Sequence, residues 1–185
     1  MALFQPSKVT LKNGQEVLLR HAEISEATAL LKALTEIFPT AQYILSTPES
    51  LKSKTVADQE KWIQDANQDP RNALVIGEYQ GRIVSIADFR SFKDKKRFHR
   101  AAFGMSVHHD LRGQGLGEAV LQKLIEVCKS VEGLTLLELN VMEPNISAHK
   151  LYLKKGFKEV GRYPGAYLLE DGTYATDIMM TLPLK

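Results

Sequence analysis

The chain has 185 residues, enough for one sizeable hydrophobic core and fewer than two ordinary domains need, so we expect a single domain over residues 1–185. Hydrophobic residues make up 44% and charged residues 25%, a composition that excludes a disordered or fibrous chain. The formal net charge is only +2, which argues against nucleic acid as a partner.

Cys128 is the only cysteine, which excludes an internal disulfide and a zinc site built on cysteine pairs. His108 and His109 are adjacent, and because two neighbours in sequence seldom point at one ion, we expect no metal. No apolar run approaches the roughly 20 residues that cross a bilayer, and residues 1–15 lack the charged start and long apolar centre of a signal peptide. We therefore expect a cytoplasmic protein with no membrane partner.

The first elements are predicted by alternation, turn residues and helix signals. Apolar and polar residues alternate on both sides of Asn13-Gly14, which predicts a hairpin because both residues tolerate positive φ. Ser25 is a good N-cap for a helix whose apolar residues recur at three- and four-residue spacing and which ends near Pro39. The chain is thus expected to open with two strands and a helix.

Three successive strands predict an antiparallel meander in the middle of the chain. In order, the remaining expected elements are a helical stretch over residues 47–70, two strands within 72–92 that turn at Gln80-Gly81, a strand over 100–107, a helix after the glycine-rich stretch 113–117, a buried strand over 134–141, a short helix over 143–155, and final strands over 157–164 and 174–184.

The stretch "LRGQGLGEAVLQKL", residues 111–124, places Gly113, Gly115 and Gly117 directly before an amphipathic helix. Glycines leave the first-turn amides open to a ligand, and these amides have no partner within the helix and carry the positive end of its dipole. A phosphate is therefore the expected guest, and Arg112 can add a forked donor to it. The alternative is that the glycines only let the helix pack tightly on its strand.

Two other phosphate-binding motifs fit this stretch poorly. A Walker loop needs Lys followed by Ser or Thr after its last glycine, but Leu116, Gly117 and Glu118 occupy that region. A dinucleotide fingerprint would need its third glycine at Glu118 and a strand running almost directly into the first glycine, and "HHDLR" intervenes.

The glycine stretch and the residues after it resemble the GNAT superfamily of acyl-CoA N-acyltransferases. The family motif Q/R-x-x-G-x-G/A is filled by Arg112, Gly115 and Gly117, and "NISAHKLYLKKGF" follows at the correct distance, from Asn145 to Phe157. The resemblance covers roughly residues 15–183, with little match over residues 38–70. It implies an α+β fold in which helices flank a mostly antiparallel twisted sheet with splayed central strands, and it implies the activity of an N-acetyltransferase.

The resemblance also implies acetyl-CoA as the acetyl donor. The loop would grip its pyrophosphate, and its pantetheine arm would insert between the strands at 100–107 and 134–141. A β-bulge in the first of these strands would aim an amide at the thioester oxygen. The expected cofactor contacts are Met105, Ser106, Val107, Arg112, Gly113, Gln114, Gly115, Leu116, Gly117, Glu118, Asn145, Ala148 and Tyr152.

Acetyl transfer to an amine needs a neutral nucleophile, stabilisation of the tetrahedral oxyanion and a proton for the departing thiolate. Tyr152 matches the tyrosine that supplies this proton in many relatives, although core packing is the other explanation for it. Asn140 stands where several relatives carry a glutamate base, and an amide cannot do that work. Glu138, two residues back on the same strand face, is the candidate base, or else a carboxylate that orients the substrate.

The expected acceptor is a small-molecule or peptide amine that attacks directly, since Cys128 lies on a buried helix face and is a poor nucleophile. Its expected contacts are Asp88, Glu138, Asn140 and Tyr167. The acceptor cannot be named, because residues 38–70, where this fold builds the acceptor site, match little. A non-catalytic acyl-CoA-binding or sensor module is the alternative function, a nucleotide-binding protein is a remoter one, and a homodimer stays open.

Overall fold

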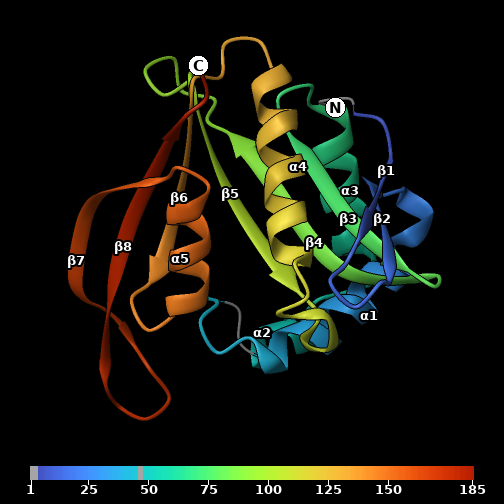
Figure 1. The fold of residues 1–185 in the computed structure, drawn as a ribbon, viewed down its shortest axis with the longest axis horizontal. Helices are drawn as coiled ribbons and strands as arrows, with labels where there is room; N and C mark the ends of the chain where they lie inside the picture. Colours follow the sequence, from blue (N-terminus) through green and yellow to red (C-terminus); the bar gives the residue numbers. More distant parts are fainter. Residues whose placement is uncertain (1–3, 46–47) are drawn as a thin grey trace.

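The computed structural model describes residues 4–45 and 48–185. Within them, the strands form one sheet in the order β1-β2-β3-β4-β5-β6-β8-β7, with only β5 and β6 parallel (Figure 1). The strands are β1 Ser7–Thr10, β2 Glu16–His21, β3 Ala73–Tyr79, β4 Arg82–Ser91, β5 Arg100–Val107, β6 Leu136–Met142, β7 Lys158–Leu168 and β8 Tyr174–Pro183. The α-helices are α1 Ala27–Ile37, α2 Pro48–Lys52, α3 Val56–Gln68, α4 Leu116–Ser130 and α5 Ile146–Lys154. This arrangement confirms the expected α+β fold.

Helices cover the sheet on both faces, and each face has its own hydrophobic core. On one face α4 packs over β2, β3 and β4, while α1 and α3 pack on the other (Figure 1). Strand β3 shows why both are needed, because Ala73 belongs to the α4 core and Leu74 and Ile76 to the α1–α3 core. A strand buried on both faces reads as a continuous apolar run, and "ALVI" at the start of β3 is one.

The central strands separate at the point where β5 and β6 meet. Their pairing covers only Arg100–Ala102 against Leu136–Glu138, and beyond it the two strands diverge (Figure 1). The expected bulge in β5 is wrong: its pairing with β4 runs without a register shift from Ser91↔Ala101 to Ser85↔Val107. The open edge of β5 therefore comes from the departure of β6 and not from an extra residue.

Two predicted element starts are corrected. Ser25 does not cap α1, because it lies in a 3₁₀ turn, Ile24–Glu26, whose Glu26 carboxylate accepts the Glu23 N–H at 2.8 Å. At the Asn13-Gly14 turn only Gly14 has a positive φ, 82°. Asn13 does not, because Gln80 is the one non-glycine residue in the described ranges with positive φ. The first hairpin therefore closes through a wider loop than the expected two-residue turn.

The helical stretch predicted over residues 47–70 is two helices, α2 and α3; Thr47 itself lies outside the described residues. Thr55 begins α3 as its N-cap, since its Oγ1 accepts the Asp58 N–H at 3.2 Å and Asp58 accepts the Thr55 N–H at 2.7 Å. This reciprocal cap fixes a new helix start and so interrupts the longer helix. In the described part of the chain, no helix is both long and apolar enough to cross a membrane.

Candidate functional site

The glycine loop before α4 presents a run of backbone N–H groups. Gly113 has φ 74° and Gly115, the N-cap of α4, has φ 91°, conformations that a side chain would strain. A Cβ at either position would meet open space. Among the residues that the structure describes, none accepts a hydrogen bond from the N–H groups of residues 113–118. The loop is therefore a set of unpaired donors at the positive end of a helix.

Packing holds these donors in place. Leu116, Val120, Leu121 and Leu124 are fully buried in the α4 core, and each such side chain contributes about 1.5–3 kcal/mol by leaving water. Gly117 faces the other way, where a Cβ would lie 3.7 Å from Met105 and Val107 side chains. Buried side chains thus fix the start of α4, while the glycines leave its backbone N–H groups uncovered.

A cavity of about 470 Å³ opens over this loop, and we name it the loop cavity. It is lined by Thr40–Ile44, Met105, Ser106, Val107, Arg112, Gly113, Gly115, Gly117, Glu118, Asn145, Ser147, Ala148, Leu151 and Tyr152. Most of the expected cofactor contacts therefore line one cavity. Gln114 and Leu116 are exceptions, since neither lines the cavity, and Leu116 is 0% exposed.

Arg112 has more partners than the sequence suggested. Its Nε donates to the Val107 carbonyl at 3.0 Å, and its two terminal nitrogens donate to the Thr40 carbonyl at 2.7 Å and the Thr40 Oγ1 at 3.0 Å. A guanidinium has five N–H donors, so two remain for an anion. Arg112 thus ties the glycine loop to the segment that follows α1.

Glu118 is a carboxylate beside the expected phosphate site, and two lysines compensate it. Lys154 donates to it at 2.6 Å and Lys155 lies 3.1 Å away, both from the end of α5. The bond from Lys154 lowers the pKa of Glu118, which keeps the pair ionised. An anion in the loop cavity therefore does not face an uncompensated negative charge.

A second cavity, of about 570 Å³, lies where β5 and β6 separate, and we name it the fork cavity. Its lining includes Leu34, Phe38, Tyr43, Trp62, Asp88, Arg90, Phe103, Gly104, Asn140, Met142 and Tyr167. Six residues line both cavities, namely Tyr43, Ile44, Met105, Ser106, Asn145 and Tyr152. The two cavities are therefore adjoining parts of one site.

Tyr152 lies at the junction of the two cavities. The side chain is 9% exposed and packs edge-on against Phe103, with ring centroids 5.7 Å apart. Burial raises the pKa of Tyr152 to about 12, because a phenolate would lose its hydration. The hydroxyl is therefore protonated at neutral pH and available as a donor. Two helical turns earlier, Asn145 caps α5 by accepting the Ala148 N–H at 3.3 Å, as the sequence predicted.

Asp88 is the buried carboxylate of the fork cavity. It lies on β4 opposite Gly104 and is 8% exposed, with the Arg90 Nε 2.9 Å from its Oδ2. Burial raises the pKa of Asp88 above its ordinary value, and the charge of Arg90 only partly opposes this. A perturbed carboxyl group in a cavity is a typical candidate for proton transfer.

Glu138 does not share this position. It lies at the last position of β6 that pairs with β5, where Arg100 binds its carboxylate at 2.5 and 2.7 Å, and it lines neither cavity. Asn140, two residues further, lies beyond the separation of the strands and does line the fork cavity. The structure thus gives Glu138 a structural ion pair, and Asp88 is the better-placed carboxylate.

Comparisons with known proteins agree with this geometry. Residues 29–157 match the family model described as the Acetyltransferase (GNAT) family. The chain belongs to the GNAT family of acetyltransferases. It is 24% identical over 161 residues to the L-amino acid N-acetyltransferase AaaT of Escherichia coli (strain K12), covering 86% of this chain and 93% of that protein.

Solved structures share the fold of this GNAT acetyltransferase. An acetyltransferase of the GNAT family from Streptococcus pneumoniae has a TM-score of 0.87 at 20% identity, covering 91% of this chain and 99% of that one. The structure of yncA from Salmonella typhimurium with its cofactor acetyl-CoA has a TM-score of 0.77 at 16% identity, covering 91% and 94%. Acetyl-CoA is the acetyl donor of this family, and the unpaired amides of residues 113–118 suit its pyrophosphate.

Sequence reasoning pointed to residues 38–70 but missed individual residues that line the fork cavity of this GNAT acetyltransferase. Tyr43, Trp62 and Phe103 form part of its wall, and none was assigned to the site. The available signal was Trp62, the only tryptophan, on a helix with few apolar residues. The position of Tyr43 has no comparable signal, because it lies in a segment without regular structure.

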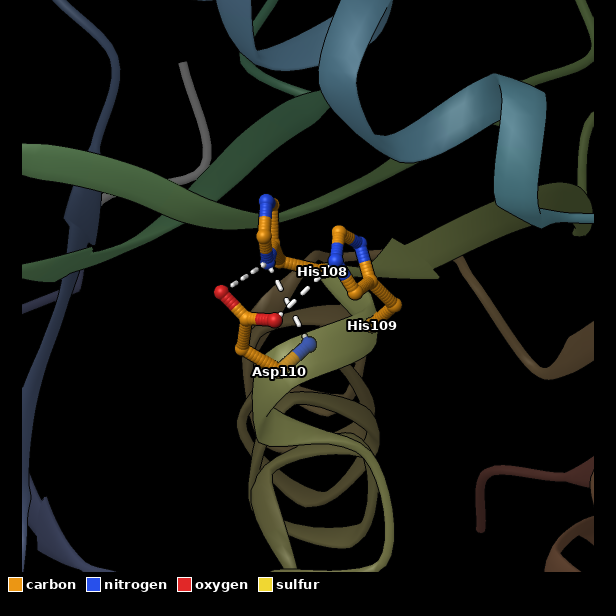
Figure 2. Close-up of side chains that lie close together, drawn as sticks. All are labelled: His108, His109 and Asp110. Carbon is orange, nitrogen blue, oxygen red and sulfur yellow. Dashed lines mark hydrogen bonds and ion pairs between the residues drawn. The ribbon is translucent and has the colours of Figure 1, made fainter.

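The two adjacent histidines lie at the end of β5, beside the glycine loop (Figure 2). His108 is buried, with 4% of its surface exposed, whereas His109 is exposed. Donor atoms of His108, His109 and Asp110 lie within 4.8 Å of one another. However, the rings stack with centroids 4.3 Å apart and planes 27° apart, and the His108 Nδ1 accepts the Asp110 N–H at 3.3 Å. Lone pairs in nearly parallel ring planes do not converge, so this geometry suits a turn.

Proposed function

We propose that this GNAT acetyltransferase moves the acetyl group of acetyl-CoA to a primary amine that enters the fork cavity. The observation that carries the proposal is that Tyr152, whose hydroxyl is protonated at neutral pH, lines both the loop cavity and the fork cavity. The loop cavity would hold the cofactor, and the thioester would reach Tyr152 along the open edge of β5. Backbone groups of Met105, Ser106 and Val107 would hold the pantetheine arm there.

Asp88 and Tyr152 would carry the two proton transfers. A primary amine is mostly protonated at neutral pH, and the Asp88 carboxylate would take the proton that makes it a nucleophile. The amine nitrogen then bonds to the thioester carbon, the carbon–sulfur bond breaks, and the Tyr152 hydroxyl protonates the departing thiolate. A second proton lost by the nitrogen restores that hydroxyl, and the first reaches solvent from Asp88.

L-amino acids are the first acceptors to test, because the Escherichia coli relative is named for that class. The fork cavity supports this choice with an inward carboxylate for an amine, apolar and aromatic walls, and the cations Lys54 and Arg90 in its lining for a second, negative group. Cavities of this size commonly hold small ligands with a few placed polar groups.

The test mixes the protein, acetyl-CoA and a panel of the standard L-amino acids, spermidine and a short peptide, and measures thiol release and product mass. Thiol release with at least one amine is expected. Binding of acetyl-CoA without thiol release across the panel would instead favour a non-catalytic acyl-CoA-binding module.

A matched pair of variants ties the activity to the glycine loop. Gly115→Ala and Gly172→Ala both place a side chain at positive φ with open space around it, but only the first lies in the loop. Gly115→Ala should weaken acetyl-CoA binding about tenfold or more, from a strain of order 1–3 kcal/mol at the site, while Gly172→Ala should not. Equal acetyl-CoA affinity in the two variants would show that the glycine loop does not bind the cofactor.

A further inference from the structure

Asp177 is a buried carboxylate directly behind the wall of the fork cavity. It lies on β8, paired with Met142 of β6 and with Tyr163 of β7, and it is 8% exposed. It does not line the cavity itself, whereas Asn140 and Tyr167, which interact with its carboxylate, both do. Burying a carboxylate costs free energy, so we ask what Asp177 does for the two neighbours that contact it.

Hydrogen-bond direction at Asp177 fixes which atoms its neighbours show to the cavity. The Asn140 Nδ2 donates to the Asp177 Oδ2, and an ionised carboxylate can only accept. The planar amide of Asn140 therefore turns its Oδ1 away from Asp177, and Oδ1 is the atom left to face the cavity that Asn140 lines.

Tyr167 follows the same rule. Burial raises the pKa of Tyr167 to about 12, and the neighbouring Asp177 carboxylate adds to this, so the hydroxyl is protonated at neutral pH. Asp177 Oδ1 is buried without a hydrogen-bond partner among the described residues, and a single O–H turned toward it leaves the lone pairs of Oη for a ligand. Both neighbours of Asp177 thus present acceptors.

We propose that Asp177 is a positioning residue that makes the Asn140 Oδ1 and the Tyr167 Oη a pair of hydrogen-bond acceptors for the N–H groups of the acceptor amine. With the Asp88 carboxylate of β4 in the same lining, the fork cavity then offers three acceptor groups to the three N–H groups of a primary ammonium. This inference rests on the proposed function, and it assigns Asn140 the role of orienting the amine that Asp88 deprotonates.

The experiment reverses the hydrogen-bond direction at this pair. In Asp177→Asn the new amide can donate, so Asn140 can turn its Nδ2 to the cavity and oppose an ammonium. The acceptor KM should rise about tenfold or more, as expected for loss of a hydrogen bond to a charged group, with an unchanged acetyl-CoA dissociation constant. The probe is the amine of the panel that the wild-type enzyme acetylates fastest.

The double variant Asp177→Asn with Asn140→Asp exchanges the two groups. The amide introduced on β8 would then donate to the carboxylate introduced on β6, whose second oxygen is again an acceptor facing the cavity, so the acceptor KM should recover toward the wild-type value. A purely structural role for Asp177 would change the melting temperature without this loss and recovery. The control is Asn67→Ala. This substitution removes a partly buried hydrogen bond from the Asn67 side-chain amide to the Ala22 carbonyl, and since Asn67 lines neither cavity, KM should not change.

An acceptor KM within twofold of wild type in Asp177→Asn, or no recovery in the double variant, would overturn the inference. If Asp177→Asn does not fold, Tyr167→Phe carries the test, since removal of one acceptor oxygen should raise the acceptor KM severalfold. If the wild-type protein acetylates no amine, the proposed function fails first. Calorimetric binding of the panel amines to wild type and variants in the presence of CoA then still tests the ammonium site.

Discussion

Burial raises the pKa of two side chains of the site, and the chemical consequence differs between them. The two side chains are Tyr152 and Asp88, and the charged form of each loses hydration when it is buried. For the phenol this keeps a proton in place at neutral pH. For the carboxyl group it strengthens the affinity for a proton, which is what a base that must take one from an ammonium requires.

Tyr152→Phe should lower kcat about 100-fold and leave the acetyl-CoA dissociation constant unchanged, because general acids typically contribute 10²- to 10⁴-fold. Phenylalanine preserves the edge-on contact with Phe103, so packing changes little. Steady-state kinetics and calorimetry on the same preparation measure both quantities. Turnover equal to wild type would show that Tyr152 packs the core and donates nothing.

Asp88→Asn should lower kcat/KM about 100-fold while raising stability near neutral pH. The pKa of Asp88 is raised in the folded state, so its contribution to stability is present below the ordinary Asp pKa and is lost as pH rises through the folded value. The amide variant has no such loss. The melting temperature of the variant minus that of wild type should therefore increase from pH 4 to pH 8, as scanning calorimetry can measure. A difference that is constant with pH would contradict a buried ionising carboxyl group.

The β5–β6 fork and the start of α4 are the elements that place these groups. Alternation, turn residues and the glycine-and-arginine motif predicted the helices, the meander and the bare amides, because those signals are local in the chain. The roles of Glu138 and Asn140 could not be separated in this way. They lie two residues apart on one strand, and what distinguishes them is where β5 stops pairing with β6, which depends on the whole sheet.

The link between Arg112 and Thr40 was likewise beyond sequence reasoning, because it joins segments 72 residues apart. Segment 40–44 contributes to both cavities, so this link holds the glycine loop to a wall that the two cavities share. Thr40→Val removes the Oγ1 bond at nearly constant volume and should raise the acceptor KM about fivefold, since a bond to a charged donor is lost. Steady-state kinetics measures this KM.

Thr40→Ser is the matched control, because it keeps the hydroxyl that accepts from Arg112 and should behave like wild type. Arg112→Lys should combine both defects, a raised acceptor KM and weaker acetyl-CoA binding, because an ammonium cannot span the Val107 and Thr40 oxygens and an anion together. If Thr40→Val and Thr40→Ser share the wild-type KM, the link has no part in acceptor binding.

The molecule as a whole separates its stabilising contacts from its reactive ones. Two cores clamp the sheet from both faces, while the fork between β5 and β6 leaves strand edges unpaired. Asp88 on β4 and Asp177 on β8 are buried carboxylates near that fork, and a buried carboxylate costs free energy unless it is paired. The paired end of the fork, closed by Arg100 and Glu138, limits how far the strands can separate.

Two histidines should lower the stability of the whole molecule as pH falls from 7 to 5, against the opposite contribution of Asp88. Burial lowers the pKa of His108 and of His21 in the folded protein, so the unfolded chain binds more protons and stability is lost as pH falls through the ordinary histidine value. Each also accepts a backbone N–H, from Asp110 and Phe4 respectively, which protonation of that nitrogen would break.

His108→Asn isolates one of the two, since Asn has no titration in this range and its Oδ1 can accept the same N–H. Urea unfolding at pH 5, 6 and 7 should show a smaller decrease in the free energy of unfolding for this variant than for wild type. The charged groups around His108 are His109, Asp110, Arg82 and Glu36, whose carboxylate lies 3.8 Å from the His108 Nε2. Burial lowers the pKa of His108 by more than the two carboxylates raise it. A decrease as steep as that of wild type would mean that Glu36 and Asp110 compensate the imidazolium, and His108 would then not be a source of acid sensitivity.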